Sequence, residues 1–150
     1  RPNMPNYSLK SPENTDEWDR YLLFRWEMLR KPLGMSMESL ADDIEDQSFH
    51  LMGIDHDGNV IASGRVHFNS EHEAQIRYMA VDDKFKRQGI GSEIVTELEN
   101  YALSKQAKTM TLNAREKAIS FYLSLGYSEV CPYQSDTGIP HKTMKKSLSY

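Results

Sequence analysis

The chain has 150 residues, of which 39% are hydrophobic and 27% are charged, and its formal net charge is −4. This composition is typical of one soluble domain with a single core, and no apolar run approaches the roughly 20 residues of a membrane-spanning helix. The negative charge argues against a nucleic-acid-binding protein, which needs a basic face, but it is compatible with a cationic substrate. We therefore expect one domain over residues 1–150, with neither a nucleic acid nor a membrane as partner.

Cysteine usage and the start of the chain indicate the compartment. Cys131 is the only cysteine, so no internal disulfide bond is possible, which is typical of a reducing compartment. Residues 1–4 lack the apolar stretch of a secretory signal, so we expect a cytoplasmic protein. No Cys/His metal-ligand spacing surrounds Cys131, and its segment is apolar. We therefore expect a buried thiol and no metal.

Two helical signals occupy the N-terminal third of the chain. An apolar stripe over 18–29, preceded by the capping pair Asn14 and Glu17, predicts a first helix that ends before Gly34. Ser36 can cap a second, short helix. The apolar residues on one face of this second helix are Met37, Leu40, Ala41 and Ile44.

Three strand signals follow, over 49–54, 60–68 and 75–81. The dipeptide Asp57-Gly58 predicts a tight turn between the first two strands. Small and apolar residues alternate with polar ones over 60–68, and we expect a polar face that holds Ser63, Arg65 and His67. Two successive hairpins predict an antiparallel meander.

Helical spacing dominates the second half. The predicted elements are a helix over 89–106, a strand over 109–112, a helix marked by Ala118 and Leu125 and closed by Gly126, and strands over 127–133 and 142–148. This order predicts an α/β (mixed α+β) domain with a central, mostly antiparallel mixed sheet flanked by helices. The strand–helix–strand passage near residues 75–112 could place a parallel pair in the middle of the sheet.

The connection between strand 75–81 and the next helix carries the strongest chemical signal. It contains two glycines and the cationic side chains of Lys84, Lys86 and Arg87. A helix N-terminus presents unpaired N–H groups, and glycines let a ligand approach the backbone, so the segment Lys86–Ser92 suits a phosphate or pyrophosphate. The spacing fits neither the Walker nor the dinucleotide pattern. The alternative is an ordinary strand–helix loop with cations for solubility.

Two segments together resemble the GNAT superfamily of acyl-CoA N-acyltransferases. The first is the strand end Met79-Ala80-Val81 followed by Lys86-Arg87-Gln88-Gly89-Ile90-Gly91. Lys86 stands where the family usually has Arg or Gln. A lysine keeps the positive charge but cannot form the planar bidentate bonds of an arginine. The second is Leu112-Asn113-Ala114-Arg115 with Ala118–Tyr127, and the terminal Gly138-Ile139-Pro140-His141 resembles one bacterial subset. The similarity covers about residues 49–148.

The resemblance implies direct transfer of an acetyl group from acetyl-CoA to a primary amine of a small molecule or peptide. It implies that a backbone N–H near Met79–Val81 polarises the thioester and that Asn113 bonds the pantetheine amides. It makes Tyr122 the general acid for the leaving thiolate, although an aromatic residue on an apolar helical stripe is often part of the core. The implied cofactor-binding residues are Met79, Ala80, Val81, Lys86, Arg87, Gln88, Gly89, Ile90, Gly91, Ser92, Asn113 and Tyr122.

The general base and the acceptor stay open in the sequence. The candidate bases are Glu38, His67, Glu73, Tyr78 and His141. We place His141 first because its segment is expected to border the acceptor site. The acidic residues over 42–46 could attract a cationic amine, but the solvated end of the second helix is the favoured interpretation.

Two other functions would use the same loop. A non-catalytic acyl-CoA sensor would keep the loop Lys86–Ser92 without needing Tyr122. A different phosphate-ligand enzyme would prefer ATP or NAD to CoA. The fold does not choose among acceptors, and a homodimer through a sheet edge is a further possibility.

Overall fold

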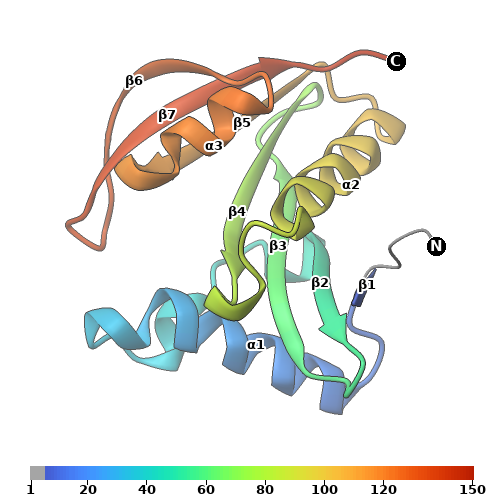
Figure 1. The fold of residues 1–150 in the computed structure, drawn as a ribbon. Helices are drawn as coiled ribbons and strands as arrows, with labels where there is room; N and C mark the ends of the chain where they lie inside the picture. The colour runs from blue at the N-terminus through green and yellow to red at the C-terminus, as the bar shows by residue number, and fades with distance from the viewer. Residues whose placement is uncertain (1–5) are drawn as a thin grey trace. The chain divides into compact units, whose positions relative to one another are not determined.

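The computed structural model describes residues 6–150, so the N-terminal segment used to predict the compartment lies outside the described residues. Seven strands are hydrogen-bonded in the order β1-β2-β3-β4-β5-β7-β6 (Figure 1). The strands are β1 (Tyr7–Lys10), β2 (Phe49–Asp55), β3 (Val60–Phe68), β4 (Glu73–Val81), β5 (Thr109–Arg115), β6 (Ser128–Gln134) and β7 (Pro140–Ser147). The α-helices are α1 (Thr15–Leu29), α2 (Ile90–Ser104) and α3 (Ile119–Ser124).

The chain forms two compact units. The first unit comprises the residues up to Arg65 together with Tyr78–Leu98, and the second comprises Val66–Arg77 and Glu99–Tyr150. The first unit therefore contains α1, β2 and the start of α2, and the second contains β5, α3, β6 and β7. Over residues 6–150, no helix has both the length and the apolar character needed to cross a membrane.

Strand pairing confirms the predicted mixed sheet. β4 and β5 are parallel, with registers from Glu73↔Thr109 to Ile76↔Leu112, as the strand–helix–strand passage indicated. β7 pairs antiparallel with β5 and with β6, while α3 lies against β5 and β6 (Figure 1). Sequence patterns missed β1, which is only four residues long and pairs antiparallel with β2.

The predicted first helix is confirmed, but the second is wrong as a single helix. Asn14 Oδ1 accepts from the backbone N of Glu17 at 2.9 Å and caps α1, as expected. The segment after Ser36 instead forms two 3₁₀ helices, η2 (Met37–Leu40) and η3 (Glu45–Gln47), and the Ser36 side chain makes no capping bond. Ala41 between them is extended, with ψ 141°. This break lets the acidic side chains that follow turn toward buried arginines, as shown below.

Burial in two segments is informative. The polar residues predicted to share one face of β3 are all buried: Ser63 and Arg65 are fully enclosed, and His67 is 7% exposed. Cys131, expected to be a buried thiol, is exposed. It belongs to β6, the last strand in the order, and all residues of this strand are exposed. An apolar segment in an edge strand is therefore not buried here.

Two glycines bring α2 close to the strands beneath it. A Cβ at Gly53 in β2 would lie 2.6 Å from Ile90 Cδ1, and one at Gly64 in β3 would lie 2.7 Å from Ile94 Cγ2. Contacts this short leave no room for a side chain at either glycine. The first turns of α2, and with them its N-terminus, are therefore held in place by close backbone packing.

Candidate functional site

The loop predicted to bind an anion joins β4 to α2 within the first unit. The backbone N of Asp82 donates to Ile61 O at 2.8 Å, and Asp82 Oδ1 accepts from the backbone N of Lys84 at 2.9 Å. A 3₁₀ turn, η4 (Asp83–Phe85), follows, and α2 begins at Ile90. These contacts anchor the start of the loop and leave the anion loop, Lys86–Ser92, between two ordered elements.

The backbone of the anion loop supplies a run of free donors. Arg87 and Gly89 both have left-handed conformations, with φ of 65° and 88°. The first hydrogen bond of α2 joins the backbone N of Glu93 to Gly89 O at 3.0 Å. Within residues 6–150, the N–H groups from Arg87 to Ser92 find no acceptor. Successive N–H groups around left-handed residues, at a helix N-terminus, form a concave anion site.

Cationic side chains stand beside these donors. Lys86 Nζ lies 2.8 Å from Asp83 Oδ1, and both side chains are more than half exposed. The Arg87 guanidinium has no hydrogen-bond partner in the described part of the chain. Both cations are therefore available to an anionic ligand, because an exposed ion pair is only weakly held.

β4 is irregular at Tyr78, the residue just before the predicted polarising segment. Tyr78 has φ 58°, which is rare for a residue with an aromatic side chain and does not occur in a regular strand. Its carbonyl accepts a side-chain hydrogen bond from Ser63 Oγ of β3 at 2.8 Å. The irregularity re-aims the backbone at the start of Met79–Val81, the segment expected to polarise the thioester.

A buried ion cluster (Arg25, Asp42, Glu45 and Arg65) lies in the same unit. Glu45 bridges both arginines, with Oε2 at 3.1 Å from Arg25 Nη1 and Oε1 at 2.6 Å from Arg65 Nη1. Asp42 accepts two further bonds from Arg65, at 2.8 and 2.9 Å. Burial alone would raise the pKa of Glu45, but the hydrogen bonds of both arginines and the charge of Arg25 lower it.

The ion cluster corrects the interpretation of the acidic run. We expected residues 42–46 to form a solvated helix end, yet Asp42 and Glu45 neutralise two arginines that are fully buried. The signal that sequence reasoning missed was the arginines themselves. Arg65 lies between Gly64 and Val66 in a strand whose neighbours are apolar, a position at which a charge needs a partner.

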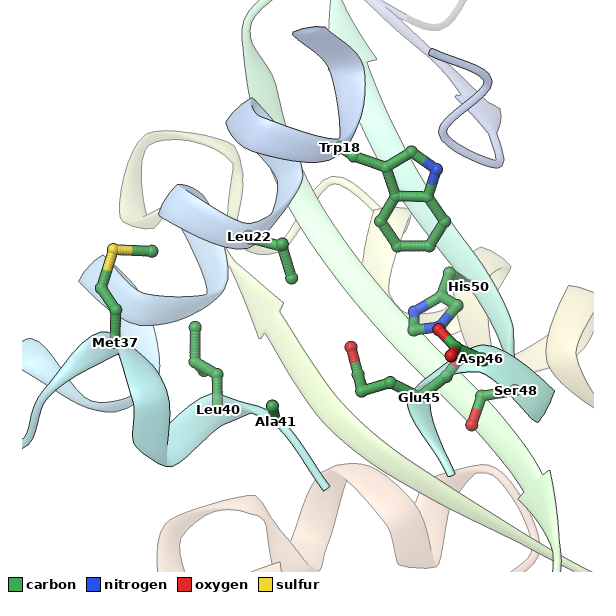
Figure 2. Close-up of a pocket in the computed structure, with 9 residues that line it drawn as sticks. All are labelled: Trp18, Leu22, Met37, Leu40, Ala41, Glu45, Asp46, Ser48 and His50. Atoms are coloured by element: carbon green, nitrogen blue, oxygen red, sulfur yellow. The ribbon is translucent and has the colours of Figure 1, made fainter. Parts of the chain in front are cut away.

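A pocket of about 460 Å³ opens beside Glu45. It is lined by Trp18, Leu22, Met37, Leu40, Ala41, Glu45, Asp46, Ser48 and His50. Figure 2 shows Trp18 and His50 on one side and Met37 and Leu40 on the other, with the Glu45 side chain between them. The pocket is mostly apolar, and Glu45, one of its carboxylates, is already bound to arginines.

His50 in this pocket has a structural role. Its Nε2 donates to Glu45 O at 2.9 Å, so its Nδ1 accepts from the Tyr21 hydroxyl at 2.7 Å. Trp18 packs edge-on against its ring, with centroids 4.8 Å apart. Burial lowers the pKa of His50, which is therefore neutral near pH 7. With both ring nitrogens engaged, His50 is not available as a base.

Asn113 and Tyr122 belong to the second unit. The Asn113 Oδ1 accepts from Thr143 Oγ1 at 2.6 Å, which orients the amide and leaves its NH₂ group without an acceptor among residues 6–150. Tyr122 is 6% exposed, and its ring contacts Phe121 and Tyr127 with centroids 4.9 and 5.7 Å away. Its hydroxyl also has no partner in the described chain, and burial raises its pKa.

The candidate bases differ in their contacts. His67 Nε2 lies 3.1 Å from Asn69 Oδ1, and Glu73 binds Asn69 and Lys145, whose contacts lower its pKa. The Tyr78 ring is covered by arginines. His141 Nδ1 donates to Ile139 O at 2.6 Å, while its Nε2 has no partner within residues 6–150. Among these candidate bases, only the exposed side chain of Glu38 and the Nε2 of His141 lack a partner within residues 6–150.

Known proteins provide an independent comparison. Residues 29–148 match a family model described as "Acetyltransferase (GNAT) domain". The uncharacterized protein YyaT of Bacillus subtilis (strain 168) is 27% identical over 108 residues, or 72% of this chain and 72% of YyaT. The family match confirms the resemblance based on the two motifs.

Solved structures agree on the fold. Ard1 from Thermoplasma volcanium superposes with a TM-score of 0.79 at 18% identity, over 97% of this chain and 100% of that chain. An aminoglycoside 6'-N-acetyltransferase complexed with coenzyme A gives a TM-score of 0.76 at 15% identity, over 95% of this chain and 98% of that chain. At this level of identity the similarity concerns the fold alone.

Proposed function

Because this chain belongs to the GNAT acetyltransferase-domain family, we propose that it moves an acetyl group from acetyl-CoA to a primary amine of a small molecule or peptide. The observation that carries the proposal is the run of free N–H groups from Arg87 to Ser92, flanked by Lys86 and Arg87. A pyrophosphate accepts several such bonds at once, and its charge suits both the helix N-terminus and the cations.

The chemistry requires three groups. The neutral amine attacks the thioester carbonyl carbon, and the carbonyl oxygen becomes an oxyanion that a backbone N–H near Met79 stabilises. The C–S bond then breaks, and the departing thiolate takes a proton from the hydroxyl of Tyr122. An ordinary phenol is protonated at neutral pH, as a general acid requires, and burial raises the pKa of Tyr122 further. The amine's surplus proton passes to a base or to water.

Ligand binding provides the first test. We expect millimolar CoA or acetyl-CoA to raise the thermal unfolding midpoint, because a ligand that binds only the folded state stabilises it. ATP and NAD serve as competitors, since a nucleotide-binding protein would prefer them. A panel of amines, monitored by release of free thiol, then identifies the acceptor class. If CoA leaves the midpoint unchanged and ATP or NAD raises it, the proposed ligand is wrong.

Tyr122→Phe separates an enzyme from an acyl-CoA sensor. We expect kcat to fall by about 10²–10⁴-fold with CoA affinity unchanged, because only the acidic hydroxyl is removed. Tyr127→Phe is the matched control: its ring is 5.7 Å from that of Tyr122, but its hydroxyl is bound to Glu99 at 2.8 Å. Equal turnover by both variants and the wild type would show that Tyr122 is not the general acid. CoA binding with no turnover on any amine would favour the sensor.

We also propose that His141 borders the acceptor. Its free Nε2 can bind an amine or receive a proton. His141→Asn should raise KM for the amine and leave KM for acetyl-CoA unchanged in steady-state assays. A change in KM for acetyl-CoA alone would assign His141 to the donor.

A further inference from the structure

Tyr78 is held in an unusual environment for a strained residue. Its φ of 58° lies in the left-handed region, where a side chain is disfavoured and which a structure maintains only by fixing the residue from outside. The ring is 7% exposed. The Arg25 guanidinium carbon is 3.8 Å from the ring centroid, and that of Arg65 is 4.9 Å away. A third buried arginine, Arg30, has its guanidinium carbon 5.6 Å from the same centroid, so three buried cations surround a single strained aromatic residue, with Arg25 and Arg65 the nearest.

The carboxylates explain why these cations stay in place. Arg25 and Arg65 would repel each other and would lose their hydration in the core. Glu45 bonds to both, and Asp42 bonds to Arg65 through both of its oxygens. Guanidinium groups stack on aromatic faces through the ring quadrupole, and this attraction is stronger where water is excluded. The buried ion cluster thus fixes where the Tyr78 ring can lie.

Peptide planarity connects Tyr78 to Met79. The Tyr78 carbonyl and the Met79 N–H belong to one trans peptide unit, in which C=O and N–H point in opposite directions. Because Ser63 Oγ of β3 binds the Tyr78 carbonyl at 2.8 Å, the Met79 N–H points away from Ser63. The register of β4 with β5 runs from Glu73 to Ile76, so Met79 lies beyond it. The Met79 N–H therefore points away from Ser63, and the β4–β5 pairs from Glu73 to Ile76 do not include an acceptor for it.

We propose that Arg25 and Arg65 are positioning residues that hold Tyr78 in its left-handed conformation and thereby aim the Met79 N–H at the developing oxyanion. This inference rests on the proposed acetyl transfer. It assigns a functional consequence to a buried ion cluster that otherwise contributes only to folding. The arginines do not touch the reacting atoms, because they act through the Tyr78 ring and the peptide that follows it.

Arg25→Met tests the proposal, with Arg25→Lys as the conservative partner. We expect Arg25→Met to lower kcat at least tenfold with KM for acetyl-CoA unchanged, since the anion loop is untouched. Arg25→Lys should recover part of kcat, because it keeps the charge but not the planar stack. Trp26→Phe is the control for lost stability: it removes the bond from Trp26 Nε1 to Met35 O in the same helix and should leave kcat unchanged. An equal loss of kcat in Trp26→Phe would overturn the proposal.

A spectroscopic readout keeps the test independent of turnover. In ¹H–¹⁵N spectra the Met79 amide resonance should shift in Arg25→Met, while those of Gly89 and Gly91 stay in place. If Arg25→Met does not fold, Tyr78→Leu replaces it, because leucine fills the core but offers no face for a guanidinium. If the wild type shows no acetyl transfer, the proposed function fails, and the Met79 resonance alone decides whether the arginines set this peptide. An unmoved Met79 resonance with wild-type kcat would refute the inference.

Discussion

Arg87 and Tyr78 lie in the same unit, and both are non-glycine residues in the left-handed conformation, with φ of 65° and 58°. Arg87 is in an exposed loop, and neither its side chain nor its N–H has a partner within residues 6–150. Tyr78 is buried under cations. The same backbone conformation thus leaves the N–H and side chain of Arg87 available to a ligand, whereas Tyr78 is fixed by the packing of the core. Changes near Arg87 should affect binding, and changes near Tyr78 should affect stability and turnover together.

The largest effect is expected from Glu45→Ala. Removing this carboxylate leaves Arg25 without its counter-ion in the core, although Arg65 keeps Asp42. Breaking a buried ion pair from one side costs about 3–5 kcal/mol, and we expect a loss of this size in the free energy of unfolding measured with urea. Asp83→Ala is the control on the loop side, because its pair with Lys86 is exposed. A similar loss in both variants would erase the contrast between the two regions.

These two regions also differ in how far the sequence predicts them. The anion loop can be predicted from the sequence, because its glycines, its cations and the start of the helix are neighbours in the chain. The ion cluster is not, because Arg65 finds Asp42 and Glu45 across 23 and 20 residues. Each carboxylate also had a local explanation, as part of a solvated helix end. Which charges are buried is decided by tertiary packing, and the short helix predicted after Ser36 was wrong for the same reason.

The strained Tyr78 was equally hidden. Nothing in the segment Met79–Val81 or before it marks a left-handed residue, because glycine or asparagine would be the usual sign. The resemblance to the GNAT superfamily assigns the polarising backbone to Met79–Val81, which stays a prediction, and it gives no cause for the backbone's direction. The cause lies in side chains from α1 and β3, which only the folded chain brings to Tyr78.

Gly64→Ala should have the next largest effect. Its Cβ would lie 2.7 Å from Ile94 Cγ2 and 2.8 Å from Met79 Sδ. Overpacking of this kind costs about 1–3 kcal/mol and forces neighbouring side chains to move. We expect a lower urea midpoint together with a shifted Met79 amide resonance. A lowered urea midpoint with an unmoved Met79 resonance would show that α2 shifts to make room for the new methyl group while β4 keeps its position.

Gly89→Ala sharpens the comparison from the loop side. A Cβ at this position meets no atom within 4 Å, so only the backbone conformation, φ +88°, opposes the change. The left-handed conformation costs a non-glycine residue roughly 1–2 kcal/mol. Relaxation of the loop would rotate the free N–H groups, so calorimetric titration should show weaker CoA binding with nearly unchanged kcat. Unchanged CoA affinity would remove the N–H run as the pyrophosphate site.

The smallest effect concerns pH, and it again separates the core from the loop. Burial lowers the pKa of His50, so the unfolded chain takes up a proton near pH 6.5 that the folded chain resists. Stability is therefore fully present above about pH 6.5 and declines as the pH falls below it, by at most about 1.4 kcal/mol per pH unit. His50→Gln should be less stable at pH 7, because it disturbs the bonds to Tyr21 and Glu45. Its free energy of unfolding, measured in urea titrations, should depend less on pH between pH 7 and 5.

A second loss of stability follows in more acidic solution, where Glu45, whose pKa is lowered in the folded state, takes up its proton and releases Arg25. The anion loop contains no histidine or carboxylate. The affinity for dephospho-CoA, which lacks the 3′-phosphate that titrates near pH 6, should therefore stay constant on the folded protein from pH 7 to 6 while stability falls. A parallel decline of both quantities would mean that the ion cluster and the loop respond as one unit.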